Sequence, residues 1–100
     1  QNGAIKMRKI EEQMNEAILN KTHQWSKDNT MVMYHSQTDE SFIYLHGHNI
    51  AKYDHFYPRV TPNADTFRDW PTSTTRSRLR ALGVNASIKN FSATIDGVTL

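Results

Sequence analysis

The chain has 100 residues, of which 37% are hydrophobic and none is cysteine, so it fits one compact domain and excludes disulfides, thiolate metal sites and thiol nucleophiles. Its 12 basic and 10 acidic residues leave a formal net charge of +2, which is too small to require a polyanionic partner. No apolar run approaches the roughly 20 residues of a membrane-spanning helix, so we expect no membrane contact. We interpret residues 1–6 as a cloning remnant or disordered leader and residues 7–100 as a single domain.

The first predicted element is a helix over residues 7–20. Ile10, Met14, Ala17 and Ile18 recur at helical spacing, and glutamate and glutamine occupy most positions between them. This pattern is typical of a surface helix that buries one apolar stripe.

Two β-rich runs follow, at residues 31–34 and 42–45, and the polar stretch between them predicts an antiparallel hairpin. A glycine at the first central position favours Gly47 and His48 as a two-residue turn. That turn predicts a second hairpin, which returns through residues 50–53.

The remainder of the chain alternates between interrupted and regular patterns. Residues 58–69 contain two prolines, so we predict an edge strand that grades into a loop. A hydroxyl-rich run then marks the start of a second helix over residues 74–82. Residues 91–95 alternate apolar and polar side chains, and the Asp-Gly pair at 96–97 predicts a final hairpin. The sum is an α+β domain with one antiparallel sheet of about five strands and two helices.

Two segments carry a family resemblance, LHGHNIA at residues 45–51 and WPTSTTRSRL at residues 70–79, together with KNF at 89–91. As a set, and with the opening IEEQMNEAI at 10–18, they resemble a family of small tailed-bacteriophage proteins. The resemblance implies a phage-encoded accessory protein that acts in the cytoplasm of an infected bacterium. It implies no established activity and transfers no functional residue.

The histidines form the first candidate site. His46, His48 and His55 lie near Asp54 in the sequence and include enough ligands for zinc or another divalent ion. If Gly47 and His48 form the turn, however, His46 ends a strand while His48 projects from the loop tip, and the pair shares no strand face. We therefore expect structural or solvent-facing roles and no metal or other cofactor.

Arg76, Arg78 and Arg80 form the second candidate site, on the helix predicted over 74–82. At about 100° per residue, Arg76 and Arg80 make a ridge opposite the buried leucines, and Arg78 flanks the buried stripe. With Thr74 and the free amides of the helix start, this ridge suits a phosphate group. The alternative is a capped helix whose cationic face is simply solvated.

The predicted sheet is apolar on both sides. Phe42 and Tyr44 share one side of their strand, whereas Ile43 and Leu45 share the other. In so small a domain the second face must be covered by the second helix, another subunit or a ligand. This mismatch predicts a homo-oligomer or a protein partner.

Catalytic patterns are absent from the sequence. No serine occupies a Gly-x-Ser-x-Gly turn, no two glycines lie close enough to cradle a phosphate, and the carboxylate pair at 39–40 falls in a predicted turn. We therefore expect neither an enzyme nor a small-molecule substrate.

Two hypotheses from different classes follow. In the first, the protein binds a host or phage protein, or itself, through the doubly apolar sheet. In the second, it is a nucleic-acid-binding accessory protein whose arginine ridge contacts phosphates. Its contact residues would be Arg76, Arg80, Lys52, Arg59 and Thr74, with Tyr44 or Trp70 as stacking groups. The low net charge favours the first hypothesis.

Overall fold

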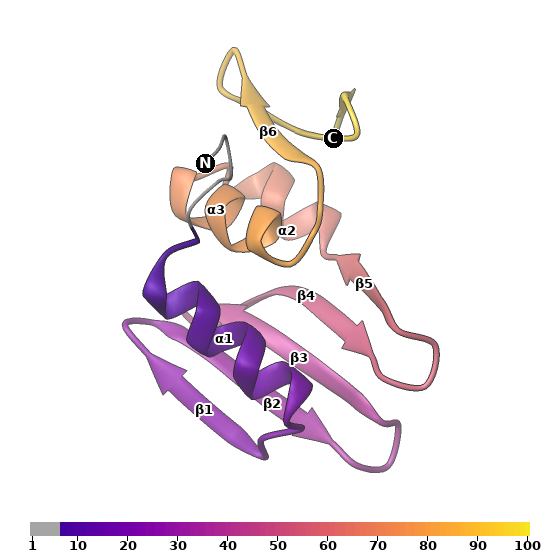
Figure 1. Ribbon diagram of the computed structural model, residues 1–100. Helices are drawn as coiled ribbons and strands as arrows, with labels where there is room; N and C mark the ends of the chain where they lie inside the picture. Colours follow the sequence, from indigo (N-terminus) through magenta and orange to yellow (C-terminus); the bar gives the residue numbers. More distant parts are fainter. Residues whose placement is uncertain (1–6) are drawn as a thin grey trace, which may run out of the picture.

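The fold was analysed in a computed structural model that describes residues 7–100, so the interpretation of residues 1–6 lies outside the described residues. Figure 1 shows two parts, a large sheet crossed by a helix and, above it, two shorter helices with a small sheet. The elements in chain order are α1 (Lys9–Leu19), β1 (Gln24–Lys27), β2 (Thr30–His35), β3 (Glu40–Leu45), β4 (His48–Asp54), β5 (Arg59–Pro62), α2 (Ala64–Asp69), α3 (Ser73–Ala81), β6 (Ala86–Lys89), β7 (Ser92–Ile95) and β8 (Val98–Thr99).

Strands β1 to β5 form an antiparallel meander in sequence order. Both predicted hairpins of this sheet are confirmed, but the predicted turn at Gly47 and His48 is wrong by one residue. His46 and Gly47 form the turn, with φ angles of +51° and +79°, and His48 already pairs with Leu45. Two positive φ angles in succession suit a tight hairpin loop, and glycine adopts the second of them without steric cost.

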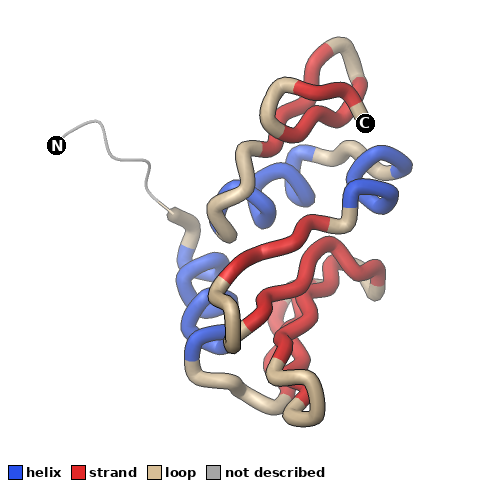
Figure 2. Tube along the Cα trace, turned by 90° about the vertical axis from the view of Figure 1, so that its right-hand side faces the viewer, coloured by secondary structure: helices blue, strands red, loops and turns tan. Residues whose placement is uncertain are grey.

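Helix α1 covers one face of this sheet (Figures 1 and 2). Its stripe of Met14, Ala17 and Ile18 is buried together with Val32 and Ile43 from the sheet. The helix predicted over residues 7–20 is thus confirmed, because an amphipathic stripe at helical spacing finds an apolar sheet face to cover.

Helix α2 is a correction to the sequence prediction. Strand β5 is the expected edge strand, but the residues after it form a helix where a loop was predicted. The side chain of Asn63 accepts a hydrogen bond from the Thr66 amide at 3.1 Å and so caps α2. The side-chain Nδ2 of Asn63 also donates a hydrogen bond to Oδ1 of Asn49 on β4 at 3.2 Å, so a tertiary contact holds the cap in place. The sequence alone showed this asparagine only as a loop signal.

Helix α3 confirms the second predicted helix, with its start one residue earlier. Thr72 caps it by accepting a hydrogen bond from the Thr75 amide at 3.1 Å.

The C-terminal strands form a second sheet. The predicted hairpin through Asp96 and Gly97 is confirmed, but strands β6 to β8 form a sheet of their own, and the prediction of one sheet is wrong. Helices α2 and α3 separate β5 from β6 and carry the chain away from the first sheet (Figure 2). Phe91, predicted within a strand, instead lies in the β6–β7 turn with φ of +66° and is 95% exposed.

The α+β fold class is therefore confirmed, with three helices and two sheets among the described residues. One cluster of buried apolar side chains joins α1, the large sheet, α2, α3 and the small sheet. Within residues 7–100, none of the helices combines the length and the apolar character needed to cross a membrane.

Candidate binding surfaces

The second face of the large sheet is a candidate protein-binding surface. Met31 pairs with Tyr44 and Met33 with Phe42, so these four side chains form a block on β2 and β3, opposite in parity to the buried residues. Each is partly exposed. In Figures 1 and 2, no helix of residues 7–100 lies over the centre of this face. We call these four residues and their surroundings the open face.

Charged and polar groups border the open face. Lys52 Nζ lies 3.2 Å from Glu40 Oε2, and the ring of His35 lies 4.7 Å from the ring of Phe42. Two residues predicted to contact nucleic acid, Lys52 and Tyr44, therefore lie on this face. Lys52 has a carboxylate partner there, which lowers its value as a phosphate ligand.

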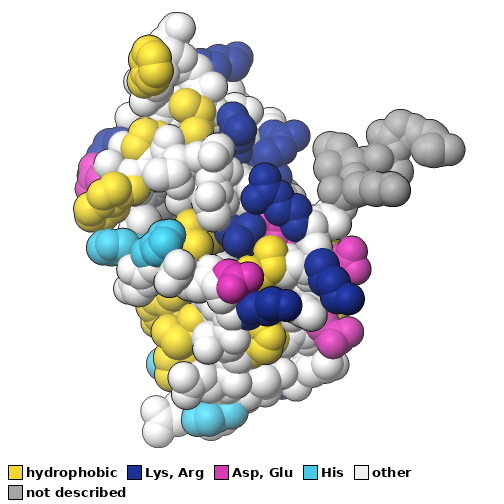
Figure 3. Space-filling view, turned by 90° about the vertical axis from the view of Figure 1, so that its left-hand side faces the viewer, with side chains coloured by type: hydrophobic (Ala, Val, Ile, Leu, Met, Phe, Trp, Pro, Cys, Tyr) yellow, Lys and Arg dark blue, Asp and Glu magenta, His cyan; other side chains and the backbone are white. Residues whose placement is uncertain are grey.

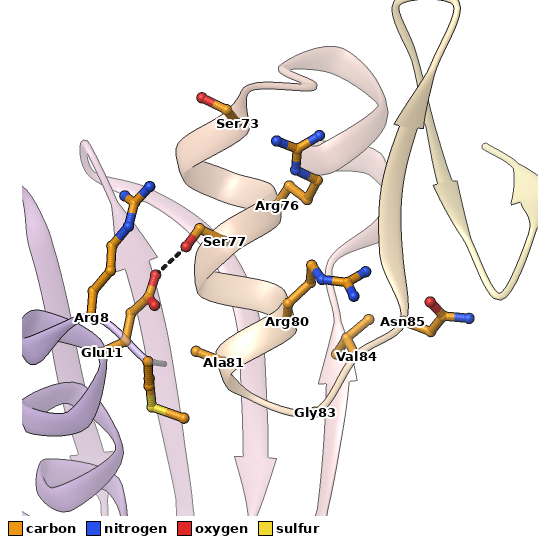
Figure 4. Close-up of a pocket in the computed structure, with 11 residues that line it drawn as sticks. Arg8, Glu11, Ser73, Arg76, Ser77, Arg80, Ala81, Gly83, Val84 and Asn85 are labelled. Carbon is orange, nitrogen blue, oxygen red and sulfur yellow. Dashed lines mark hydrogen bonds between the residues drawn. The ribbon is translucent and has the colours of Figure 1, made fainter. Parts of the chain in front are cut away.

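A second candidate surface is a groove of about 530 Å³ between the start of α1 and α3 (Figure 4). Figure 4 shows Arg76 and Arg80 leaving α3 on the side of the loop that carries Asn85, whereas Arg8, at the start of α1, lies on the other side of α3 in this view. Figure 3 shows Lys and Arg side chains down this side of the molecule, with Asp and Glu side chains among the lower ones. We call this the arginine groove, and its lining residues are Met7, Arg8, Glu11, Ser73, Arg76, Ser77, Arg80, Ala81, Gly83, Val84 and Asn85.

Glu11, which lines the arginine groove, belongs to a buried ion pair. Arg78 Nη1 donates to Glu11 Oε2 at 2.8 Å and Arg78 Nε donates to Thr30 Oγ1 at 3.1 Å, while Ser77 Oγ donates to the same glutamate oxygen at 2.5 Å. The Arg78 and Glu11 side chains are only 6% and 4% exposed. The pair connects α1, α3 and β2, and it neutralises the one acidic side chain among the described lining residues.

The other three arginines of the groove belong to no ion pair among the described residues. None of Arg8, Arg76 and Arg80 has a carboxylate of residues 7–100 within 4.0 Å. Arg80 Nη1 donates to the carbonyl oxygen of Ala86 at 2.9 Å, which holds this guanidinium at the groove wall. The structure thus brings the two predicted ridge arginines to one cavity and adds Arg8 to them.

The other predicted contact residues lie elsewhere. Thr74 is partly buried in α3 and does not line the arginine groove, and Arg59 is exposed on the edge strand β5. Trp70 is 52% exposed, and one face of its ring stacks on His48 at 4.6 Å with an interplanar angle of 26°. The predicted set is therefore dispersed over several parts of the surface.

The histidines that were weighed as a candidate metal site do not converge. His46 lies in a turn, His48 stacks on Trp70, and His55 Nε2 lies 2.8 Å from Ser41 Oγ. Burial lowers the pKa of His55 below its usual value of 6.5, although nearby Asp39 acts in the opposite direction. Among residues 7–100, no three His, Asp or Glu side chains are grouped so that they could hold a metal ion.

Sequence reasoning missed Arg8, Ser73, Ser77 and Asn85 as lining residues of the arginine groove. Arg8 and the residues of α3 are separated by more than sixty positions in the chain, roughly two thirds of its length. No local pattern records that α1 and α3 pack side by side, so this signal exists only in the fold.

Comparison with known proteins adds a family. Neither a curated protein nor a solved structure matches the chain. The family described as Kyanoviridae Gp96 protein matches residues 7–99, which is nearly all of the described domain. This match agrees with the phage resemblance of the two motif segments. The chain belongs to the Kyanoviridae Gp96 family of bacteriophage proteins.

Proposed function

We propose that this phage protein is a non-enzymatic accessory factor that works by protein–protein contact in the cytoplasm of the infected bacterium, with the open face as its contact surface. One observation carries the proposal: Met31, Met33, Phe42 and Tyr44 form a contiguous apolar block that no described helix covers. A solvated antiparallel face ordinarily carries polar side chains, and a contiguous apolar patch on a small protein marks an interaction site.

The partner that the open face fits best is a second copy of the chain. A two-fold interface needs a patch that is complementary to itself. Glu40 and Lys52 lie side by side at the border, so each copy offers one negative and one positive group. If the two-fold axis lies in the plane of the face and passes between Glu40 and Lys52, it brings each lysine near the other copy's glutamate. Methionine adds side chains that adapt their shape to a facing surface.

The expected dimer is weak. Five strands of four to seven residues, with each residue covering about 3.3 Å by about 4.8 Å, present a face of roughly 400 Å². A stable interface of standard size buries about 800 Å² on each partner. The dimer should therefore form with rising protein concentration, and the folded monomer should persist on dilution.

The test is sedimentation equilibrium over a wide concentration range at about 50 and 200 mM salt. We expect a monomer–dimer equilibrium that changes little with salt, because apolar contacts dominate it. Met33→Lys should abolish the dimer by placing a charge within the block. Leu19→Lys is the matched control, since Leu19 is 68% exposed on α1 and lies outside the open face.

Two results would overturn the proposal. One is a monomer at every concentration, and the other is an equal loss of dimer in the Leu19→Lys and Met33→Lys variants. Circular dichroism of each variant establishes that the fold is retained.

A further inference from the structure

We propose that the arginine groove binds the phosphodiester backbone of a nucleic acid, without reading its sequence. This inference is independent of the open face, because the two surfaces share no residue. A nucleic-acid strand and a small polyphosphate both present phosphate anions to such a groove. Competition by inorganic triphosphate against an oligonucleotide distinguishes the two.

The electrostatic part of the argument is the uncompensated charge. Arg8, Arg76 and Arg80 line one cavity and have no carboxylate within 4.0 Å among residues 7–100. Glu11 also lines it, but its side chain is buried and is engaged by Arg78 and by Ser77. Three like charges held in one concavity favour an anion there, since a cleft with low-dielectric walls concentrates the field.

The donor geometry suits phosphate. A guanidinium presents a planar fork that donates two parallel hydrogen bonds to one phosphate. Arg80 already donates to the Ala86 carbonyl at 2.9 Å, so part of the entropy cost of fixing its side chain is met before any ligand arrives. Ser73, at the start of α3, and Asn85, in the segment after this helix, add neutral donors to the lining (Figure 4).

The lining also indicates which part of a nucleic acid is bound. None of the described lining residues is aromatic, so the groove offers no ring on which a base stacks. The recognised group is therefore the phosphate, which gives register without sequence information. Figure 3 shows further Lys and Arg side chains in the upper part of this side of the molecule, which favours a polyanionic strand over a single small anion.

Fluorescence anisotropy with labelled random single-stranded and duplex oligonucleotides, at about 50 and 200 mM salt, tests the proposal. Three phosphate contacts predict an affinity for duplex DNA that falls about 40-fold over this range. The double variant Arg76→Ala with Arg80→Ala should retain one contact and a fall of only about fourfold. Arg76→Glu is a second variant that leaves the Arg80 hydrogen bond intact, and it should abolish binding at about 50 mM salt.

The matched control is Lys27→Ala with Arg68→Ala, which removes the same charge from exposed positions outside the groove. This control should keep the wild-type salt dependence. The Met33→Lys variant should also bind oligonucleotide as the wild type does, so failure of the dimer proposal and failure of this one are distinguishable.

Three outcomes would overturn the inference. They are no binding of either oligonucleotide at about 50 mM salt, an equal loss of affinity in the control double variant, and competition by inorganic triphosphate as strong as that by oligonucleotide at equal phosphate concentration. The first two remove the site, and the third assigns it to small anions in place of nucleic acid.

Discussion

The two faces of the large sheet differ in what covers them more than in what they are made of. Ile43, under α1, is fully buried, whereas its neighbour Phe42, on the open face, stays partly exposed. Both are large apolar residues on one strand. Alternate residues of a strand point to opposite faces of the sheet. The burial of an apolar strand residue therefore depends on whether another element lies over its face.

The sheet face beneath α1 also carries buried polar side chains. Thr30 and Ser41 are fully buried there, and Thr30 accepts a hydrogen bond from the buried Arg78. A charged side chain is thus inside while methionine and phenylalanine are at the surface. The contrast yields four predictions, given from the largest effect to the smallest.

Arg78→Ala should have the largest effect, a loss of about 3–5 kcal/mol in the free energy of unfolding, because Glu11 would be left as an unpaired buried charge. Urea unfolding measures it. Arg76→Ala on the same helix has no ion pair to lose among the described residues and should change stability by about 0.5 kcal/mol or less. Equal losses in the two variants would contradict the anchoring role of the buried pair.

The adjacent pair on β3 compares the two faces directly. Ile43→Ala should cost about 2–5 kcal/mol, since it leaves a cavity beneath α1. Phe42→Ala should cost about 1 kcal/mol in dilute monomer, because it removes only contacts on the open face, such as that with His35. Thermal or urea unfolding at low protein concentration checks both. A larger loss for Phe42→Ala would mean that the open face is covered in the monomer.

Phe91 extends the comparison to an apolar residue outside any core. It is 95% exposed and has φ of +66°, a conformation that is costly for residues with a side chain. Phe91→Gly should therefore stabilise the monomer by about 0.5–1 kcal/mol, as judged by urea unfolding. Gly97→Ala in the next hairpin, at φ of +79°, is the converse control and should destabilise it. A loss of stability in Phe91→Gly would show that the phenyl ring has a contact within the chain.

The smallest expected effect is the pH dependence of stability that His55 contributes through its contact with the buried Ser41. The pKa of His55 is lowered by burial, and its ring contacts the buried Ser41. The unfolded chain therefore binds the proton more readily, so stability should decline as pH falls below the ordinary value of 6.5. His55→Gln should flatten this decline between about pH 7.5 and 5 in urea titrations. An unchanged slope would show that His55 does not contribute. Asp39, whose pKa is lowered by hydrogen bonds from Tyr34 and Lys21, affects the pH dependence of stability only near its ordinary pKa value of 3.8 and below.

Local signals in the sequence were sufficient for several of the elements, though not for β1 or α2. The stripe of Met14, Ala17 and Ile18 predicted α1, the hydroxyl run predicted the start of α3, and the Asp-Gly pair at 96–97 predicted the last hairpin. Each depends on neighbours within about one turn of chain, where the backbone has few alternatives. The doubly apolar sheet was also visible, because the alternation along β3 requires no tertiary knowledge.

Tertiary structure decided how those elements meet. The side chain of Asn63, which caps α2, also donates a hydrogen bond to Asn49 of β4. The small sheet is separate from the large one because α2 and α3 lie between them. The arginine groove depends on residues of α1 and α3 that are distant in the chain. Arg78 is buried because it forms an ion pair with the buried Glu11. Long-range packing sets these features, and it depends on the shape and charge of whole surfaces, which no short stretch of sequence contains.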